Sequence, residues 1–348
     1  MNEPPLYLDH AATTPLLPAA REAMLEGLDR WANPSSPHRA GRAARAALED
    51  ARERVKAALG WQGELVFTSG ASEALAIALT RCRLAPAAVS GVEHEAVLRH
   101  AGEARKLAVD GNGLVVEPLP AGLVAIQHAN NETGVVQPID RFAEDVRAQG
   151  GLLLADCAQT AGKLSLPDAD LIAISAHKFG GPIGIGALLV KDWATLRPSG
   201  GQERGYRGGT ENLPGALAMA AALEQGRDWM GSAARLRERL ESAITAAGGE
   251  IVAAGAQRLP TIGACRMPGV SAAAQLIRFD GMGIAVSAGS ACSSGSLRIS
   301  HVLGAMGMQD KAASEVIRIS IGIETKDCDM GRVIAAWRKI AGKASLAA

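Results

Sequence analysis

Two short apolar runs near the middle of the chain each end in polar side chains that can do chemistry. The first run covers residues 152–155 and the second covers residues 171–174. The polar residues that follow them are Asp156, Gln159, Ser175, His177 and Lys178. Such runs are typical of buried parallel strands, and ligands bind at the carboxyl ends of these strands in open α/β sheets. The sequence therefore predicts that an acid, an amide, an imidazole and an amine meet at one edge of a sheet.

Lys178, at the end of its apolar run, has two interpretations. The ordinary one is a solvated lysine at the rim of a sheet. The other is a partly desolvated lysine whose amine attacks a carbonyl group and forms a Schiff base. Asp156 fits the second, because a buried carboxylate would keep the pyridine nitrogen of pyridoxal 5′-phosphate (PLP) protonated.

Cys292 lies in a stretch, residues 287–296, that consists almost entirely of Ser, Ala and Gly. A cysteine is ordinarily a small, buried, apolar residue. This stretch has no bulky side chain that would bury Cys292, so we expect an exposed loop that carries a reactive thiol. The remaining cysteines are expected to be structural and buried: Cys82, Cys157, Cys265 and Cys328.

The elements that position these side chains can be located from apolar periodicity and from glycine and proline. Helices are predicted over residues 18–31, 42–59 and 140–149, and a long alanine-rich helical region is predicted from residue 214 onward. Further strands are predicted over residues 64–68, 124–128, 187–190, 261–267, 284–286 and 315–322. A chain of 348 residues with this pattern favours an α/β fold in two domains.

Composition excludes several classes of function. Lys plus Arg and Asp plus Glu both number 36, so there is no basic field for nucleic acid or an anionic membrane. The first residues lack the pattern of a signal peptide, and no apolar run is long enough to span a bilayer. Five dispersed cysteines fit a reducing cytoplasm better than a disulfide framework or a metal site.

Motifs spread along nearly the whole chain resemble those of one known family. Besides the residues after the two apolar runs, they are YLDHAATTP (7–15), NPSSPH (33–38), TSGASE (68–73), EHEAV (93–97), NNETG (130–134), GGQERGYRGGT (200–210), SAGSACSSGS (287–296) and IRISIG (317–322). Together they resemble the NifS-like cysteine desulfurases of the class V aminotransferase superfamily, which are PLP-dependent.

The resemblance implies a PLP-dependent transferase fold of type I. We expect a large PLP-binding domain over residues 13–228, with a mostly parallel, seven-stranded type of sheet flanked by helices. Residues 1–12 and 229–348 would form a smaller α+β domain that carries the loop with the catalytic cysteine.

The resemblance also implies roles for individual residues. Lys178 would hold PLP, Asp156 would pair with the pyridine nitrogen, and His94 would stack on the ring and move protons. Contacts to the ring oxygen and the phosphate would come from Asn131, Gln159, Ala71, Ser72, Ser175, His177 and Thr210. Thr210 would reach the phosphate of a neighbouring subunit, which implies a homodimer with shared active sites. Arg318, Asn33 and Asn131 would bind the substrate, with Arg318 taking its carboxylate.

The activity implied is that of an L-cysteine desulfurase, a sulfurtransferase that yields L-alanine and leaves sulfur as a persulfide on Cys292. A sulfur acceptor or scaffold protein would then receive the sulfur, with iron–sulfur cluster assembly as the commonest outlet. One alternative is a selenocysteine lyase or another class V lyase or aminotransferase. A more distant alternative is a non-catalytic subunit of a sulfur-transfer assembly, because Ala74, Leu75 and Ala76 replace an asparagine pair usual in the family.

Overall fold

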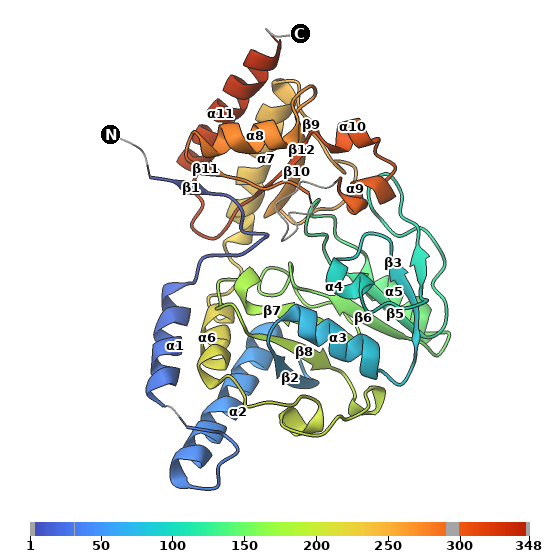
Figure 1. The fold of residues 1–348 in the computed structure, drawn as a ribbon, viewed down its shortest axis with the longest axis vertical. Helices are drawn as coiled ribbons and strands as arrows, with labels where there is room; N and C mark the ends of the chain where they lie inside the picture. The colour runs from blue at the N-terminus through green and yellow to red at the C-terminus, as the bar shows by residue number, and fades with distance from the viewer. Residues whose placement is uncertain (1–3, 31, 290–298, 346–348) are drawn as a thin grey trace.

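The computed structural model describes residues 4–30, 32–289 and 299–345. Figure 1 shows a large sheet and its helices in one half of an elongated molecule, and a smaller group of strands and helices in the other. The N-terminal strand β1 (Leu6–Tyr7) lies in the smaller half, beside elements from the end of the chain.

The large sheet has the strand order β2-β8-β7-β6-β5-β3-β4. Strand β8 runs antiparallel to both of its neighbours, and the other neighbouring pairs are parallel. The strands are β2 (Glu64–Thr68), β3 (Pro86–Ser90), β4 (Arg105–Leu107), β5 (Leu123–Gln127), β6 (Leu152–Asp156), β7 (Leu171–Ser175) and β8 (Gly186–Val190). This mostly parallel sheet of seven strands confirms the predicted fold class.

Helices cover both faces of the large sheet, which explains why its central strands are apolar throughout. On β6, Leu153 and Ala155 pack into the cluster that contains α1, α2, α5 and α6, whereas Leu154 packs against α3 and α4. Successive strand residues point to opposite faces, so each face has its own core. These helices are α1 (Pro18–Asp29), α2 (Arg39–Leu59), α3 (Ala71–Arg81), α4 (Glu95–Leu98), α5 (Ile139–Arg147) and α6 (Leu213–Leu223).

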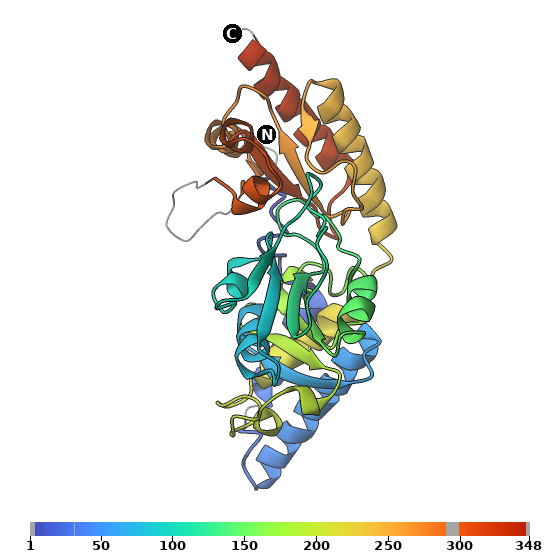
Figure 2. The same cartoon turned by 90° about the vertical axis from the view of Figure 1, so that its right-hand side faces the viewer.

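The smaller half contains an antiparallel sheet with the order β12-β10-β9 and a parallel pair formed by β1 and β11. Its strands are β9 (Glu250–Ile251), β10 (Ile262–Arg266), β11 (Ile284–Ala285) and β12 (Val316–Ser320). Its helices are α7 (Met230–Ala246), α8 (Ala272–Asp280), α9 (His301–Ala305), α10 (Asp310–Ala313) and α11 (Asp327–Ser345). Figure 2 shows α7 and α11 beside one another on this half.

The predicted alanine-rich helical region consists of two helices, α6 and α7. Residues 224–229 separate α6 from α7, and Gly226 has a φ of +71°, which does not continue a right-handed helix. The other predicted helices and strands lie within a few residues of their observed bounds. None of the helices in the described ranges is long and apolar enough to cross a membrane.

Each half has a large apolar cluster of its own, and two smaller clusters contain residues of both halves. Leu6 and Leu8 belong to the cluster formed by α7, α8, α11 and β12, away from the clusters of the large sheet. We propose that residues 13–228 form one domain and that residues 1–12 with 229–348 form the other. The boundary at residue 228 falls in the segment between α6 and α7.

Candidate active site

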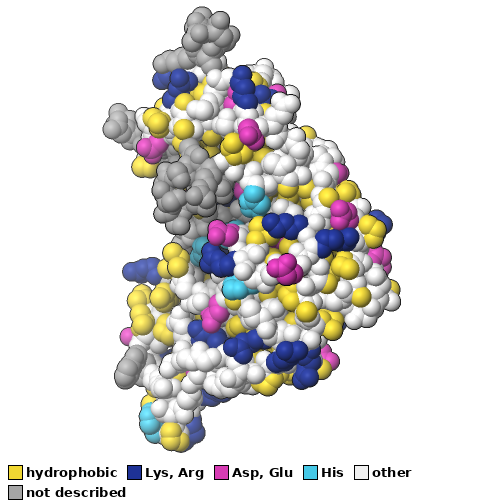
Figure 3. Space-filling view, turned by 45° about the vertical axis from the view of Figure 1, so that its right-hand side comes forward, with side chains coloured by type: hydrophobic (Ala, Val, Ile, Leu, Met, Phe, Trp, Pro, Cys, Tyr) yellow, Lys and Arg dark blue, Asp and Glu magenta, His cyan; other side chains and the backbone are white. Residues whose placement is uncertain are grey.

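A cavity of about 770 Å³ lies at the carboxyl ends of β5, β6 and β7, facing the smaller half of the molecule. Figure 3 shows histidine, acidic and basic side chains on the surface where the larger and smaller halves of the molecule meet. The structure brings together here most of the residues singled out from the sequence. The cavity is lined by Ala71, Ser72, His94, Asn131, Asp156, Gln159, Ser175, His177, Lys178 and Arg318, among others.

Lys178 reaches the cavity because β7 ends at Ser175 and is followed by a single 3₁₀ turn, Ala176–Lys178. Its Nζ donates hydrogen bonds to the backbone oxygens of Ala11 (2.6 Å) and Ala12 (2.9 Å). Burial, together with the positive charge of Arg318, lowers the pKa of Lys178 to about 8. A substantial fraction of this amine is therefore unprotonated near pH 8, and an unprotonated amine is a nucleophile.

Asp156 is the last residue of β6 and lies almost completely buried beside the cavity. One carboxylate oxygen accepts a hydrogen bond from the backbone N–H of Ala158 (2.9 Å). Burial raises the pKa of Asp156, although the charges of His94 and Lys178 oppose that rise. Within the described ranges Asp156 forms no ion pair, so a cationic group bound in the cavity would stabilise its ionised form.

The N-terminus of α3 forms an open anion cradle on the cavity wall. Its N-cap is Gly70, at a φ of +156°, and no side chain caps the first turn. A Cβ on Gly70 would lie 3.5 Å from the hydroxyl oxygen of Ser175, and a Cβ on Gly186 would lie 2.7 Å from the Cα of Gly70. Free backbone N–H groups at a helix N-terminus bind phosphate, and Ala71 and Ser72 supply the first of them here.

Two of the histidines at the cavity were singled out from the sequence. The Nδ1 atom of His94 accepts a hydrogen bond from the backbone N–H of Ala96 (3.1 Å), so the neutral ring carries its proton on Nε2. The Nδ1 atom of His177 lies 3.1 Å from the hydroxyl of Thr13. Burial and the charges of Lys178 and Lys163 lower the pKa of His177 to about 4, so this ring is neutral at physiological pH.

Arg318 enters the cavity from β12 in the smaller half. Its Nη2 donates to a carboxylate oxygen of Asp9 (2.7 Å) and its Nη1 donates to the backbone oxygen of Asn131 (2.9 Å). Gln159 donates from Nε2 to the backbone oxygen of Ala11 (3.0 Å). The Nε of Arg318 and the Oε1 of Gln159 are both buried and have no hydrogen-bond partner among the described residues.

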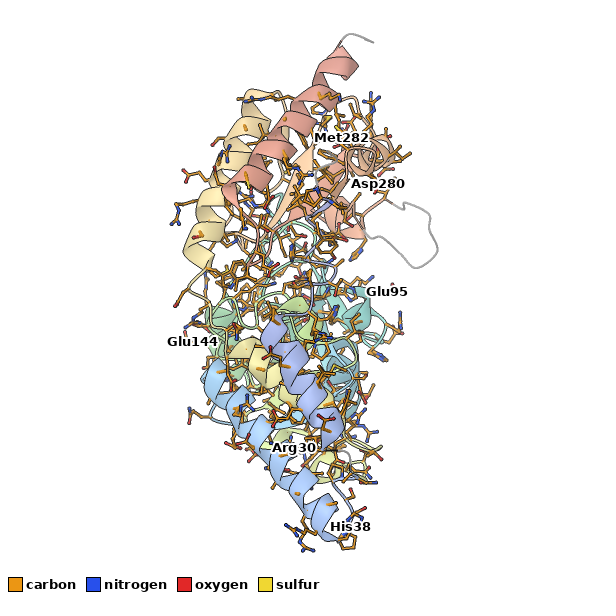
Figure 4. All side chains as sticks on the ribbon, turned by 90° about the vertical axis from the view of Figure 1, so that its left-hand side faces the viewer. Arg30, His38, Glu95, Glu144, Asp280 and Met282 are labelled. Carbon is orange, nitrogen blue, oxygen red and sulfur yellow. The ribbon has the colours of Figure 1, made fainter. Side chains whose placement is uncertain are left out.

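Three candidate residues do not line this cavity as described. Asn33 is exposed beyond the end of α1, and its side chain accepts a hydrogen bond from the N–H of Ser35. Figure 4 shows the nearby His38 at the far tip of the molecule, well separated from Glu95 at the cavity. Thr210 is exposed in the glycine-rich loop. Cys292 lies outside the described residues, although Gly289 before it and Ile299 after it line the cavity.

The other cysteines divide into two groups. Cys82, Cys157 and Cys265 are buried, as expected for structural residues, and burial raises the pKa of Cys265 to about 12. The expectation that Cys328 is buried is wrong: it is exposed. Cys328 lies in the first turn of α11, whose apolar residues Met330, Val333 and Trp337 face the core and leave Cys328 on the outer side.

The structure adds polar residues to this region that the sequence did not single out. Asp9, Glu132 and His301 line the cavity, and Ser300 donates to a carboxylate oxygen of Glu132 (2.5 Å). Lys163 is buried near Lys178, and burial, with the charge of Lys178, lowers the pKa of Lys163 to about 7. Asp9 and Glu132 lie within the motifs at 7–15 and 130–134, but their contacts in the cavity are with residues distant in the sequence, which the motifs do not reveal.

Comparison with known proteins places the chain in a family. The model of the aminotransferase class-V family matches residues 6–333. A cysteine desulfurase of Cereibacter sphaeroides is 37% identical over 94% of each chain. The structure of a NifS-like protein from Rickettsia africae superimposes with a TM-score of 0.88 at 29% identity, covering 97% of this chain and 99% of that one. A structure described as SspA in complex with cysteine superimposes with a TM-score of 0.79 at 29% identity, covering 92% of this chain and 100% of that one. With a family match across nearly its whole length, the chain belongs to the aminotransferase class-V family.

Proposed function

We propose that this protein is a PLP-dependent L-cysteine desulfurase. The observation that carries the proposal is the pairing, in one cavity, of Lys178 with a lowered pKa and the buried acid Asp156. The names of the relatives support it, because they include cysteine desulfurases and a protein solved in complex with cysteine. These relatives do not favour the selenocysteine lyase alternative.

The residues around the cavity fit PLP. The uncapped N-terminus of α3, with Ser175 and His177 beside it, suits a phosphate group. Asp156 lacks a cationic partner in the described ranges, and a protonated pyridine nitrogen would supply one. The side chains of Gln159 and Asn131 both line the cavity, and their amides would form hydrogen bonds with polar groups of the ring. When bound, PLP supplies a carbonyl carbon for an amine and an electron sink for the carbanion.

The side chains of this chain would then divide the work of binding and proton transfer. Arg318 would bind the carboxylate of L-cysteine, because a guanidinium donates two parallel hydrogen bonds to such a group. Lys178, once its amine is free, would take the proton from the α-carbon, since its pKa of about 8 suits a general base. His94 would act as a nearby acid or base through Nε2.

Cys292 would accept the sulfur. Its thiolate would attack the substrate sulfur, so that a sulfur–sulfur bond forms while the carbon–sulfur bond breaks and its electron pair stays with carbon. A proton then reaches that carbon, which gives L-alanine and leaves a persulfide on Cys292. The position of Gly289 and Ile299 at the cavity supports this role.

We also propose the partners of this reaction. In a homodimer with shared sites, exposed Thr210 would bind the phosphate in the neighbouring subunit, and exposed Asn33 would contact the substrate. A sulfur acceptor or scaffold protein would take the persulfide sulfur, with iron–sulfur cluster assembly as one outlet. The four cysteines within the described residues are dispersed and unpaired, which supports a reducing compartment such as the cytoplasm.

The direct test is to incubate the purified, PLP-loaded protein with L-cysteine and a thiol reductant and to measure alanine and sulfide. The wild type should form both in equal amounts, and K178A should form neither. Alanine formation from selenocysteine alone would favour the lyase alternative. Absence of products from both substrates would refute the proposal.

A further inference from the structure

One short segment near the N-terminus lies beside the end of β12. The backbone N–H of Ser320 donates to the oxygen of Leu8 (2.9 Å), and the hydroxyl oxygen of Ser320 accepts from the N–H of Ala11 (2.9 Å). Asp9 and Ser320 also pair as neighbours in parallel strands do. Residues two apart on a strand share a face, so the side chains of Arg318 and Ser320 lie on the same face, and Ala11 reaches that face through the Ser320 hydroxyl.

Gly322, two residues beyond the end of β12, shows how closely the segment is fitted. A Cβ on Gly322 would lie 2.2 Å from the ring of His10, so a side chain at this position would displace the segment. The segment therefore pairs with β12 at Ser320 and is closely fitted against Gly322 just beyond it. This fit, together with the ion pair itself, holds the carboxylate of Asp9 next to Arg318.

Asp9 fixes one side of the Arg318 guanidinium. Its carboxylate oxygen lies 2.7 Å from Nη2, and the backbone oxygen of Asn131 lies 2.9 Å from Nη1 on the other side. Both Asp9 and Arg318 line the cavity, but the arginine is the more deeply buried of the two. A guanidinium has five N–H donors, so these two bonds leave donors for a further acceptor.

The same segment also contacts the amine end of the cavity. The backbone oxygen of Ala11 accepts hydrogen bonds from both Lys178 (2.6 Å) and Gln159 (3.0 Å). Thr14 donates its backbone N–H to the oxygen of His177 (2.7 Å). Residues 9–14 therefore connect Arg318 of the smaller half to Lys178 of the larger one, and both of these side chains line the cavity.

We propose that Asp9 is a positioning residue that orients the Arg318 guanidinium for the carboxylate of the substrate. The inference rests on the proposed function, because it takes an amino acid as the substrate. Without Asp9, the guanidinium would keep its hydrogen bond to Asn131 but would rotate more freely about its side-chain torsions. Binding of the substrate carboxylate would then cost the conformational entropy of ordering the guanidinium.

The test compares two small probes that differ in the group Arg318 would bind. 3-Mercaptopropionate has the thiol and carboxylate of cysteine without the amine, and cysteamine has the thiol and amine without the carboxylate. Calorimetry with the PLP-loaded protein should show that D9A weakens the binding of 3-mercaptopropionate about tenfold, the size expected for a hydrogen bond to a charged group. The affinity for cysteamine should stay within about twofold of the wild type.

Two further variants separate positioning from general damage to the fold. D9E keeps the carboxylate and should recover part of the affinity for 3-mercaptopropionate. D327A removes an aspartate from a pair with Arg239 that lies away from the cavity, and it should change neither affinity. Equal loss of both probes in D9A, no loss of either, or no binding of 3-mercaptopropionate to the wild type would overturn the inference. If D9A loses affinity for 3-mercaptopropionate alone, as expected, but the wild type forms no alanine from L-cysteine, the proposed function fails and the role of Asp9 stands.

Discussion

At the scale of single residues, the site depends on burial changing the chemistry of ordinary side chains. Lys163 is buried and Lys178 is partly buried, and for both groups burial is the main cause of the lowered pKa. Lys178 faces the cavity and has a proposed use for its free amine. The side-chain amine of Lys163 forms no hydrogen bond or ion pair with the residues described around it, so its charge is a cost to the folded state.

We predict that K163M is more stable than the wild type below pH 7. The pKa of Lys163 is about 7 when folded and near 10.4 when unfolded, so the folded state binds fewer protons between these values. The cost of burying the charge is complete below pH 7 and declines as the pH rises towards 10, by up to about 1.4 kcal/mol per unit.

Urea unfolding at pH 6.5 and pH 9 measures this difference. The advantage of K163M should be larger at pH 6.5 than at pH 9. K191M, which removes an exposed lysine paired with Asp168, is the matched control and should give no such advantage. A wild type that is more stable than K163M at pH 6.5 would show that Lys163 has a stabilising partner.

The site residues could be predicted from sequence to different degrees. Asp156 and Lys178 follow apolar runs, and the carboxyl ends of neighbouring parallel strands meet at one edge, so their proximity follows from local pattern. Asp9 could not be found in this way, because its partner Arg318 is 309 residues away and the pairing depends on the register of β12. The roles of these residues were predicted from the family resemblance and not from the local sequence pattern.

At the scale of elements, buried strands were the most predictable features. Residues 64–68, 152–156 and 171–175 are strands as their apolar runs indicate, since a strand covered on both faces leaves a continuous signal. Strand β11 lies within the predicted stretch 284–286, but its parallel pairing with β1 joins distant parts of the chain and leaves no local signal. The predicted helical region from residue 214 gave no position for the break between α6 and α7, because Ala-rich composition outweighs one glycine in a helical window.

The close approach of β8 to the start of α3 gives a second prediction. A Cβ on Gly186 would lie 2.5 Å from the backbone oxygen of Ile174 and 2.7 Å from the Cα of Gly70. Both are backbone atoms, so displacing either of them would cost free energy of folding. G186A should therefore destabilise the fold by about 1–3 kcal/mol and displace the phosphate cradle. We expect its dissociation constant for PLP to rise about tenfold or more.

Thermal unfolding and a PLP titration check both parts of this prediction. G231A is the control, because Gly231 is exposed in α7 and a Cβ there meets only the end of the Arg235 side chain. It should leave PLP affinity unchanged and stabilise the helix by up to about 1 kcal/mol. Unchanged PLP affinity in G186A would mean that the phosphate binds elsewhere.

At the scale of the whole molecule, the cavity faces elements from both halves, and the proposed function adds a second subunit. If Thr210 completes the neighbouring site, a T210A subunit paired with a K178A subunit has one site with both residues intact. Mixing the two variants under exchange conditions should restore about a quarter of the wild-type sites by random pairing. The rate of sulfide release from the mixture, compared with that of each variant alone, is the measurement. A mixture no faster than the average of its components would contradict shared sites.

The account as a whole depends on sulfur passing from L-cysteine to Cys292 in a cavity built around Lys178. The most direct measurement is a single turnover of the PLP-loaded protein with L-cysteine in the absence of reductant, followed by mass spectrometry of its peptides and quantification of alanine. The account predicts one alanine per chain and a mass increase of one sulfur atom on the peptide that contains Cys292, with neither in K178A. Alanine without added sulfur on that peptide, or no alanine at all, would contradict it.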